Sequence, residues 1–91
     1  MTLTERDGAL VITALPLEDM ALLALAVPLT TELERVLTAL LSGKRVVVTA
    51  EAFEYKRYRR TAPLGVYQKF TAMERQLRAM GLVRAGKGEG I

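Results

Sequence analysis

The residues best suited to chemistry in this chain lie in one short segment, residues 54–60, with the sequence EYKRYRR. Guanidinium groups bind phosphate oxygens through paired hydrogen bonds, and a tyrosine ring stacks on flat ligands. The segment therefore predicts a site for a phosphate or a phosphorylated cofactor, with Arg57, Arg59 or Arg60 on the phosphate and Tyr55 or Tyr58 on the ring. Two alternatives stay open. The same residue types bind single-stranded nucleic acid through charge and stacking, or the segment is a solvent-exposed loop or subunit contact whose arginines pair with nearby carboxylates.

Two more polar residues, Thr49 and Glu51, lie where a strand is predicted to end. Residues 44–49 (KRVVVT) predict a buried strand, and ligands in open α/β sheets bind beyond the carboxyl ends of the strands. The Thr49 hydroxyl and the Glu51 carboxylate are therefore candidate ligand groups, and Glu51 could act as a base or hold a ribose or an amine. In the alternative interpretation Thr49 only caps the strand and Glu51 balances the charge of the arginines.

The composition excludes several classes of site. The 91 residues contain no cysteine and no histidine, so disulfides, Cys/His metal sites and histidine-dependent triads are excluded. There is no Gly-x-Gly-x-x-Gly motif and no P-loop, and we predict no catalytic residue and no metal site. The longest apolar run, residues 20–29, is too short to span a bilayer. We therefore expect a soluble, cytoplasmic protein with no membrane partner.

The apolar pattern predicts one α/β domain over residues 9–83, with flexible ends at residues 1–8 and 84–91. Residues 9–14 predict a strand buried on both faces, and residues 17–26 a helix so apolar that it should be buried. Thr30 or Thr31 begins a second helix, and Thr31 and Glu34 have the spacing of a capping box. The strand at residues 44–49 follows. A third helix then begins near Pro63 and carries an apolar stripe: Val66, Phe70, Met73, Leu77 and Met80.

This order, strand-helix-helix-strand-helix, predicts a parallel crossover and a partial Rossmann-like sheet. A parallel sheet of two strands is not stable alone. We therefore expect that oligomerisation, or an N-terminal half missing from this sequence, completes the sheet. The hydrophobic fraction of 51% is high for so short a chain and also favours a homo-oligomer.

Three stretches carry a resemblance to a known family. They are the LPL motif at 15–17 with the apolar residues 22–26, the stretch LTALLSGKRVVV at 37–48, and EAFEYKRY at 51–58 with the TAP motif at 61–63 and Tyr67. With them, residues 14–83 resemble the C-terminal half of a flavoprotein-like family of bacterial ethanolamine-utilisation proteins, which are encoded with bacterial microcompartments. The resemblance implies a Rossmann-like fold, microcompartment or pathway proteins as partners, and FMN as a possible cofactor, because related flavin-dependent decarboxylases bind FMN.

Three functions are therefore predicted, in order of preference. The first is an accessory, non-catalytic α/β protein of this ethanolamine-utilisation type, associated with the cytoplasm or a microcompartment, that acts by self-assembly or by docking on partners. The second is a flavin- or phosphate-binding protein whose site lies at a subunit interface. The third is a weak nucleic-acid-binding module, although the positive charge is concentrated in one segment and the net charge is only +3, which argues against a general polyanion binder.

Overall fold

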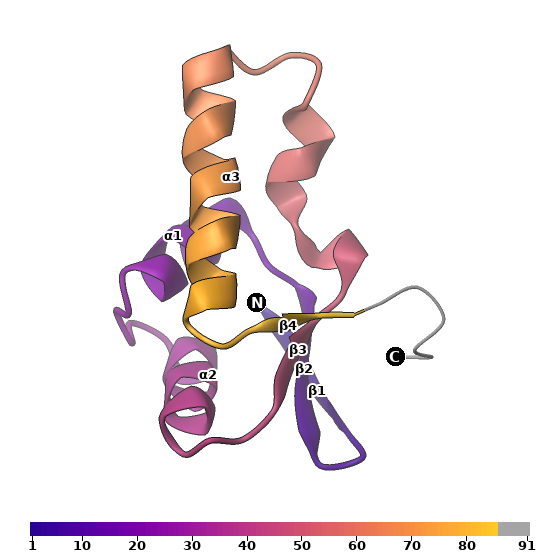
Figure 1. The fold of residues 1–91 in the computed structure, drawn as a ribbon, viewed down its shortest axis with the longest axis vertical. Coiled ribbons are helices and arrows are strands. Elements are labelled where there is room, and N and C mark those ends of the chain that lie inside the picture. Colours follow the sequence, from indigo (N-terminus) through magenta and orange to yellow (C-terminus); the bar gives the residue numbers. More distant parts are fainter. Residues whose placement is uncertain (86–91) are drawn as a thin grey trace.

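The computed structural model describes residues 1–85. A four-stranded sheet in the order β1-β2-β3-β4 is packed with three helices (Figure 1). The strands are β1 (Thr2–Arg6), β2 (Ala9–Ala14), β3 (Val46–Val48) and β4 (Val83–Arg84), and the helices are α1 (Leu17–Ala24), α2 (Thr31–Leu41) and α3 (Leu64–Ala79). Two short 3-10 helices, η1 (Ala50–Ala52) and η2 (Glu54–Tyr58), follow β3. Strands β2, β3 and β4 are parallel and β1 is antiparallel. The predicted α/β class and the mostly parallel, partial Rossmann-like sheet are confirmed.

Strand β1 was not predicted, because four of its five residues are polar and the segment was expected to be flexible. It pairs with β2 across the turn at Asp7 and Gly8, which have φ angles of 49° and 80°. Positive φ at both central residues is typical of a type I′ hairpin turn, and Asp-Gly is a strong local signal for that turn. Most of β1 is exposed, which suits a polar edge strand. The interpretation of residues 1–8 as a flexible end is therefore corrected.

Strand β4 is the second strand that was not predicted. Gly81 has a φ of 114°, a conformation that side chains other than glycine rarely adopt, and it turns the chain from α3 back to the sheet. Val83 then lies opposite Val47 in a parallel pairing. Arg84, placed by the sequence pattern in a flexible tail, thus belongs to the sheet. The rest of that predicted tail, from residue 86 on, lies outside the described residues.

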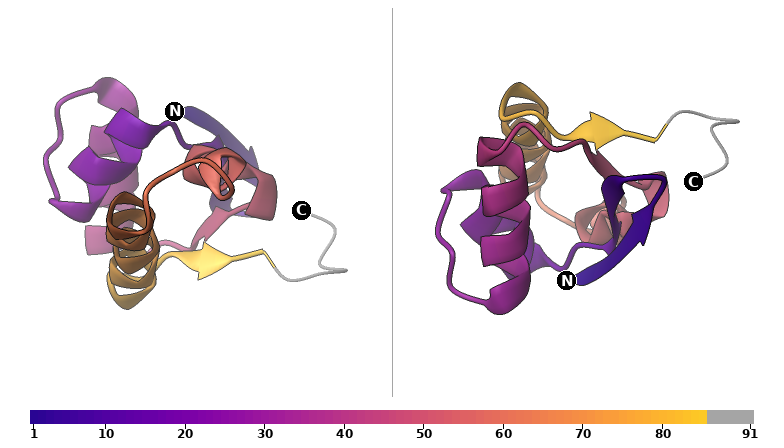
Figure 2. Two further views of the ribbon diagram at one scale, coloured as in Figure 1. Left: turned by 90° about the horizontal axis from the view of Figure 1, so that it is seen from above. Right: turned by 90° about the horizontal axis from the view of Figure 1, so that it is seen from below.

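The two faces of the sheet contribute to separate apolar clusters. Leu10 and Ile12 of β2, with Val46 and Val48 of β3, join the main core, which also contains residues of all three helices: Met20, Leu23, Leu33, Val36 and Leu77. The three helices accordingly lie on one side of the sheet (Figures 1 and 2). The opposite-facing Ala9, Val11 and Val47 are also buried and pack with Ala85. The prediction that the first strand is buried on both faces is confirmed for residues 9–12.

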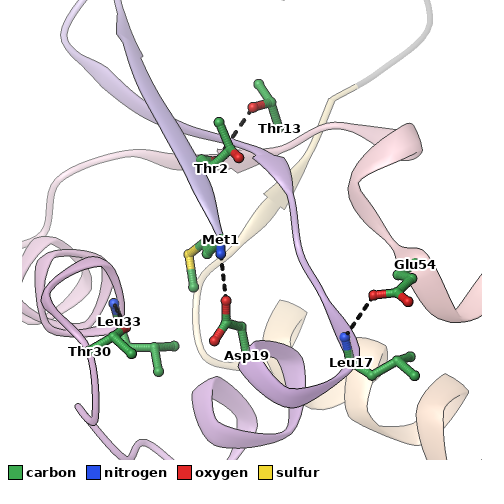
Figure 3. A network of polar contacts seen from close by, with 8 residues as sticks. All are labelled: Met1, Thr2, Thr13, Leu17, Asp19, Thr30, Leu33 and Glu54. Carbon is green, nitrogen blue, oxygen red and sulfur yellow. Dashed lines mark hydrogen bonds and ion pairs between the residues drawn. The ribbon is translucent and has the colours of Figure 1, made fainter.

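A carboxylate that is distant in the sequence caps α1. The N-cap is Pro16, which has no side-chain acceptor. The backbone N–H of Leu17 instead donates a hydrogen bond of 3.3 Å to Oε1 of Glu54 (Figure 3). A negative charge at a helix N-terminus is stabilising. Asp19 in the first turn pairs with the amino group of Met1 at 2.6 Å. Glu54, the first residue of the segment 54–60 that we call the cationic segment, thus has a structural role as the cap of α1.

Thr30 is the residue that caps the N-terminus of helix α2. The Thr30 Oγ1 accepts a hydrogen bond of 3.2 Å from the backbone N–H of Leu33 (Figure 3), so Thr30 is the N-cap. Of the two predicted starting residues, the structure selects the first. Thr31 lies inside the helix, and the capping box expected from Thr31 and Glu34 is not formed.

Helix α1 ends in a left-handed turn that exposes the next residues. Ala26 has a φ of 58°, and the N–H groups of Ala26 and Val27 donate to the carbonyls of Leu23 and Leu22, both at 2.9 Å. This is a Schellman motif with alanine where glycine is usual. The chain then runs along the surface, and Leu25 and Leu29 are 73% and 66% exposed. The prediction that the helix at 17–26 is buried is therefore wrong at its C-terminal end.

Candidate functional site

The cationic segment lies beyond the carboxyl ends of β2 and β3, as predicted. Leu15, directly after β2, forms an isolated parallel bridge with Phe53, and its N–H donates to the carbonyl of Ala52 at 2.8 Å. Helices η1 and η2 therefore continue the line of the sheet at the edge where open α/β domains bind ligands. The position of the segment is therefore that of a ligand-binding site. Which ligand it could bind depends on the direction in which its side chains point.

Tyr55, predicted to stack on a ligand, is part of the core. Only 4% of its surface is exposed. Its ring packs near Phe70, Tyr67 and Phe53, with centroid distances of 5.8, 5.3 and 6.1 Å, within the range of favourable aromatic pairs. With three aromatic rings around it, the Tyr55 ring presents little surface on which a cofactor ring could stack.

The hydroxyl of Tyr55 donates a short hydrogen bond to Oε1 of Glu74, a carboxylate of α3 that is only 7% exposed. Three cations from different elements surround this carboxylate. Arg78 lies 3.1 Å from Oε2, Lys56 lies 3.6 Å from Oε1, and Arg84 of β4 lies 4.0 Å from Oε2. We call these five residues the Tyr55–Glu74 cluster. It joins η2, α3 and β4 through one buried charge, and buried charges are tolerated when they are paired and hydrogen-bonded.

Glu74 was not singled out from the sequence. It lies four residues after Phe70 and three before Leu77, so it shares a helix face with two apolar residues. A carboxylate on an apolar face is a signal for a buried polar partner. The sequence does not show that the partner is Tyr55, because the two residues meet only when η2 packs on α3.

Burial raises the pKa of the Tyr55 hydroxyl above its ordinary value, and the hydrogen bond to Glu74 and the negative charge of Glu74 add to the effect. These causes favour the neutral phenol, since a phenolate next to a buried carboxylate would be both desolvated and repelled, and they outweigh the opposing charge of Arg84. Tyr55 is thus a hydrogen-bond donor in this cluster over the physiological pH range.

Raising the pH above about 10, the ordinary pKa of tyrosine, is expected to destabilise the protein through Tyr55. The unfolded chain loses this proton near that pH and the folded chain keeps it, so the unfolded state binds fewer protons. The free energy of unfolding then falls by up to about 1.4 kcal/mol per pH unit. The contribution is fully present below that pH and is lost as the pH rises toward the folded-state pKa. Urea unfolding from neutral to alkaline pH measures the slope, and Tyr55→Phe should be less steep. Equal slopes would contradict the assignment.

The arginines of the segment point to solvent. Arg57, Arg59 and Arg60 are exposed, and within residues 1–85 they form no ion pair or hydrogen bond through their side chains. The alternative in which they pair with Glu51 or Glu54 is therefore not observed. Glu54 caps α1, and Glu51 is exposed on η1. The three guanidinium groups are available to an anion or to an acidic surface.

Thr49 lies at the end of β3 and is half-buried. Its N–H donates to the carbonyl of Ile12 at 3.1 Å, and its own carbonyl accepts from Ala52 at 3.1 Å. These backbone bonds extend the β2–β3 pairing and start η1. Thr49 is the N-cap residue of η1, but its side chain forms no capping hydrogen bond there. The predicted site residues therefore separate into the buried Tyr55, the half-buried Thr49, the half-exposed Tyr58, and exposed charges at Glu51 and the three arginines.

A small apolar pocket opens beside the exposed arginines. We call it the aromatic pocket. It has a volume of about 170 Å³ and is lined by Leu17, Tyr55, Tyr58, Ala62, Val66, Tyr67 and Phe70. Drug-sized ligands and cofactors usually occupy roughly 300–1,000 Å³, so the pocket is too small for a flavin ring with its ribityl chain. Tyr58, half-exposed between Arg57 and Arg59, connects the pocket to the cationic surface.

Comparison with known proteins does not identify a family or a function for this chain. The chain was compared with models of protein families, with curated proteins and with solved structures. Nothing matches. The resemblance to ethanolamine-utilisation proteins thus stays a prediction, and the function has to be argued from the geometry.

Two further observations concern the part of the chain that the structure describes. No helix there is long and apolar enough to cross a membrane. In the same residues, no three acidic side chains lie close enough together to hold a metal ion.

Proposed function

We propose that this chain is an accessory protein without a catalytic site of its own and that it acts by self-assembly. The observation that carries the proposal is the apolar loop, residues 25–29 with the sequence LAVPL. All five residues are apolar, and all five are exposed. A contiguous run of exposed apolar residues on a protein surface marks a site of interaction with another molecule.

The surroundings of the apolar loop enlarge the patch. A shallow groove of about 440 Å³ lies beside the loop and is lined by Ala26, Pro28, Glu34, Leu37, Thr38, Leu40, Leu41 and Met80. Leu41 at its rim is 89% exposed. The left-handed conformation of Ala26 costs roughly 1–2 kcal/mol, and it directs the loop along the surface. The strained conformation of Ala26 holds the apolar side chains of the loop in water, which is unfavourable in the isolated chain. A second molecule that covers these side chains would offset this cost.

The resemblance stated above supports a cellular context for this proposal. It rests on residues 14–83, and above all on the stretch 51–63. On that basis we place the protein among the accessory components of ethanolamine utilisation, with microcompartment or pathway proteins as further partners.

Sedimentation velocity over a wide range of chain concentrations tests the self-assembly. We expect the mass of the wild-type chain to rise with concentration. The double variant Leu25→Ser, Leu29→Ser should shift the association to much higher concentration, because it removes exposed apolar area without touching the core. Leu64→Ser is the matched control, since Leu64 is an exposed leucine of α3 outside the loop and groove. A wild-type chain that stays monomeric at every concentration would overturn the proposal.

A phosphate-bearing ligand is the second candidate, and the exposed guanidinium groups of Arg57, Arg59 and Arg60 favour it. Tyr58 is the remaining tyrosine of the segment for a ring to stack on, because Tyr55 is buried. Titration with FMN, followed by flavin fluorescence and by the melting temperature, decides this case. Inorganic phosphate serves as the ring-free probe. A single-stranded oligonucleotide tests the nucleic-acid alternative, whose affinity should fall steeply with salt.

A further inference from the structure

We infer that the copies of this chain assemble head to tail, with the apolar loop of one copy inserted into the aromatic pocket of the next. The inference rests on the proposed self-assembly and names the two surfaces that make it. One surface is a protruding apolar loop and the other is a small apolar hole. Both surfaces belong to the same chain, and in a single copy the loop stays exposed and the pocket stays open.

The apolar loop is shaped to insert a side chain into a partner. Leu25 and Leu29 are the two large side chains most exposed within it. The Schellman turn at Ala26 holds one end of the loop, and the Thr30 cap of α2 holds the other. A loop fixed at both ends loses little conformational entropy when a partner covers it.

The aromatic pocket is large enough to receive one aliphatic side chain. Its volume of about 170 Å³ is close to that of an apolar cavity of roughly 150 Å³ that takes up benzene. Its lining is apolar throughout, so it offers no hydrogen-bond partner to a polar ligand. Val66 and Tyr58 form an exposed part of the lining, and a leucine side chain can therefore reach it from outside.

The charges beside the two surfaces are opposite. Glu32 and Glu34 lie in the first turn of α2, directly after the loop, and Arg57, Arg59 and Arg60 flank the Tyr58 edge of the pocket. The asymmetry extends through the chain. Residues 1–50 contain six acidic and four basic side chains, whereas residues 51–85 contain three acidic and eight basic ones. Complementary charge steers two surfaces together and fixes their register, and here it favours a second copy of the same chain as the occupant.

The two surfaces cannot meet within one copy. Leu17 of the pocket and Leu25 of the loop lie at opposite ends of α1, which holds them about 12 Å apart at 1.5 Å per residue. In Figure 1 the loop after α1 lies at the far left and the turn before α3 lies at the top. A contact between two different patches is heterologous, and it produces a ring or an open chain of subunits instead of a symmetric dimer.

Mixing two defective variants tests this geometry. The loop variant is Leu25→Ser, Leu29→Ser, which keeps its pocket. The pocket variant is Val66→Glu, which keeps its loop and places an acid at the pocket mouth. An acid in the first turn of α3 suits the helix dipole, so folding should be preserved. Leu64→Glu is the matched control, because it adds the same charge to the same helical turn outside the pocket.

Each variant alone is expected to sediment as a monomer, and Leu64→Glu should assemble like the wild type. An equimolar mixture of the two variants should form a species of twice the chain mass that does not grow further, because the intact loop of one fills the intact pocket of the other and the remaining surfaces are both defective. If the wild type assembles but the mixture stays monomeric, or if Val66→Glu assembles normally, the head-to-tail contact is overturned and self-assembly stands. A monomeric wild type overturns both.

Discussion

Glu74→Lys is expected to lower the free energy of unfolding by about 3–5 kcal/mol, the cost of leaving buried charge without its partner. The substitution replaces the carboxylate that Arg78 and Lys56 contact at 3.1 and 3.6 Å with a further cation. It also removes the acceptor of the Tyr55 hydroxyl. Domains of this size are stable by roughly 5–15 kcal/mol, so much of the variant should be unfolded in mild denaturant.

The matched control for this change is Glu74→Gln. Its amide oxygen still accepts from Tyr55, and only the charge is lost, so we expect a cost of about 1–2 kcal/mol, near that of one charge-assisted hydrogen bond. Urea unfolding followed by far-ultraviolet circular dichroism measures both variants. Equal losses for Lys and Gln would contradict the prediction, because they would show that the added cation and the lost acceptor of Tyr55 cost nothing beyond the loss of the negative charge.

The main elements of the fold follow from local pattern. The run of β-branched residues at Val46–Val48 and the apolar stripe of α3 have periods that only a strand and a helix satisfy. Strand β1 was not predicted because four of its five residues are polar, and its pairing depends on the Asp7–Gly8 turn. Strand β4 has only two residues, Val83 and Arg84, which is too short for any period to show.

The candidate site was predicted in position but not in orientation. Charge and aromatic residues after a strand indicate where a site lies, and η2 does lie at that edge of the sheet. Which side chains turn inward depends on contacts distant in the sequence. Tyr55 turns in because Glu74, 19 residues later, accepts a hydrogen bond from its hydroxyl, and Glu54 turns toward Leu17 of α1, 37 residues earlier. No local pattern carries these pairings, so a buried tyrosine was interpreted as a ligand contact.

The inward side chains of η2 determine which of its residues remain for binding. With Tyr55 and Glu54 used for structure, the surface of η2 retains three arginines and Tyr58. Exposed arginines beside a pocket too small for a flavin attract extended or macromolecular anions better than they enclose a small one. The acidic side chains after the apolar loop are anions of this type, and they are part of every copy of the chain.

Tyr55→Ala is expected to destabilise the protein by about 3–5 kcal/mol, the usual cost of truncating a large buried aromatic residue. Three neighbouring rings, those of Phe53, Tyr67 and Phe70, lose their common partner. The buried Glu74 carboxylate loses a donor. Because the Tyr55 ring also lines the aromatic pocket, its removal enlarges the pocket and joins it to the core.

Tyr55→Phe separates the two contributions, since it keeps the ring and deletes the hydroxyl. We expect it to cost about 1–2 kcal/mol, because Glu74 keeps its cations but loses one buried hydrogen bond. Combining it with Glu74→Gln closes a double-mutant cycle, in which contacting residues show coupling of about 0.5–3 kcal/mol. Strictly additive losses would mean that the hydrogen bond between Tyr55 and Glu74 contributes nothing to stability. Measurable coupling would establish that this bond contributes to holding η2 on α3.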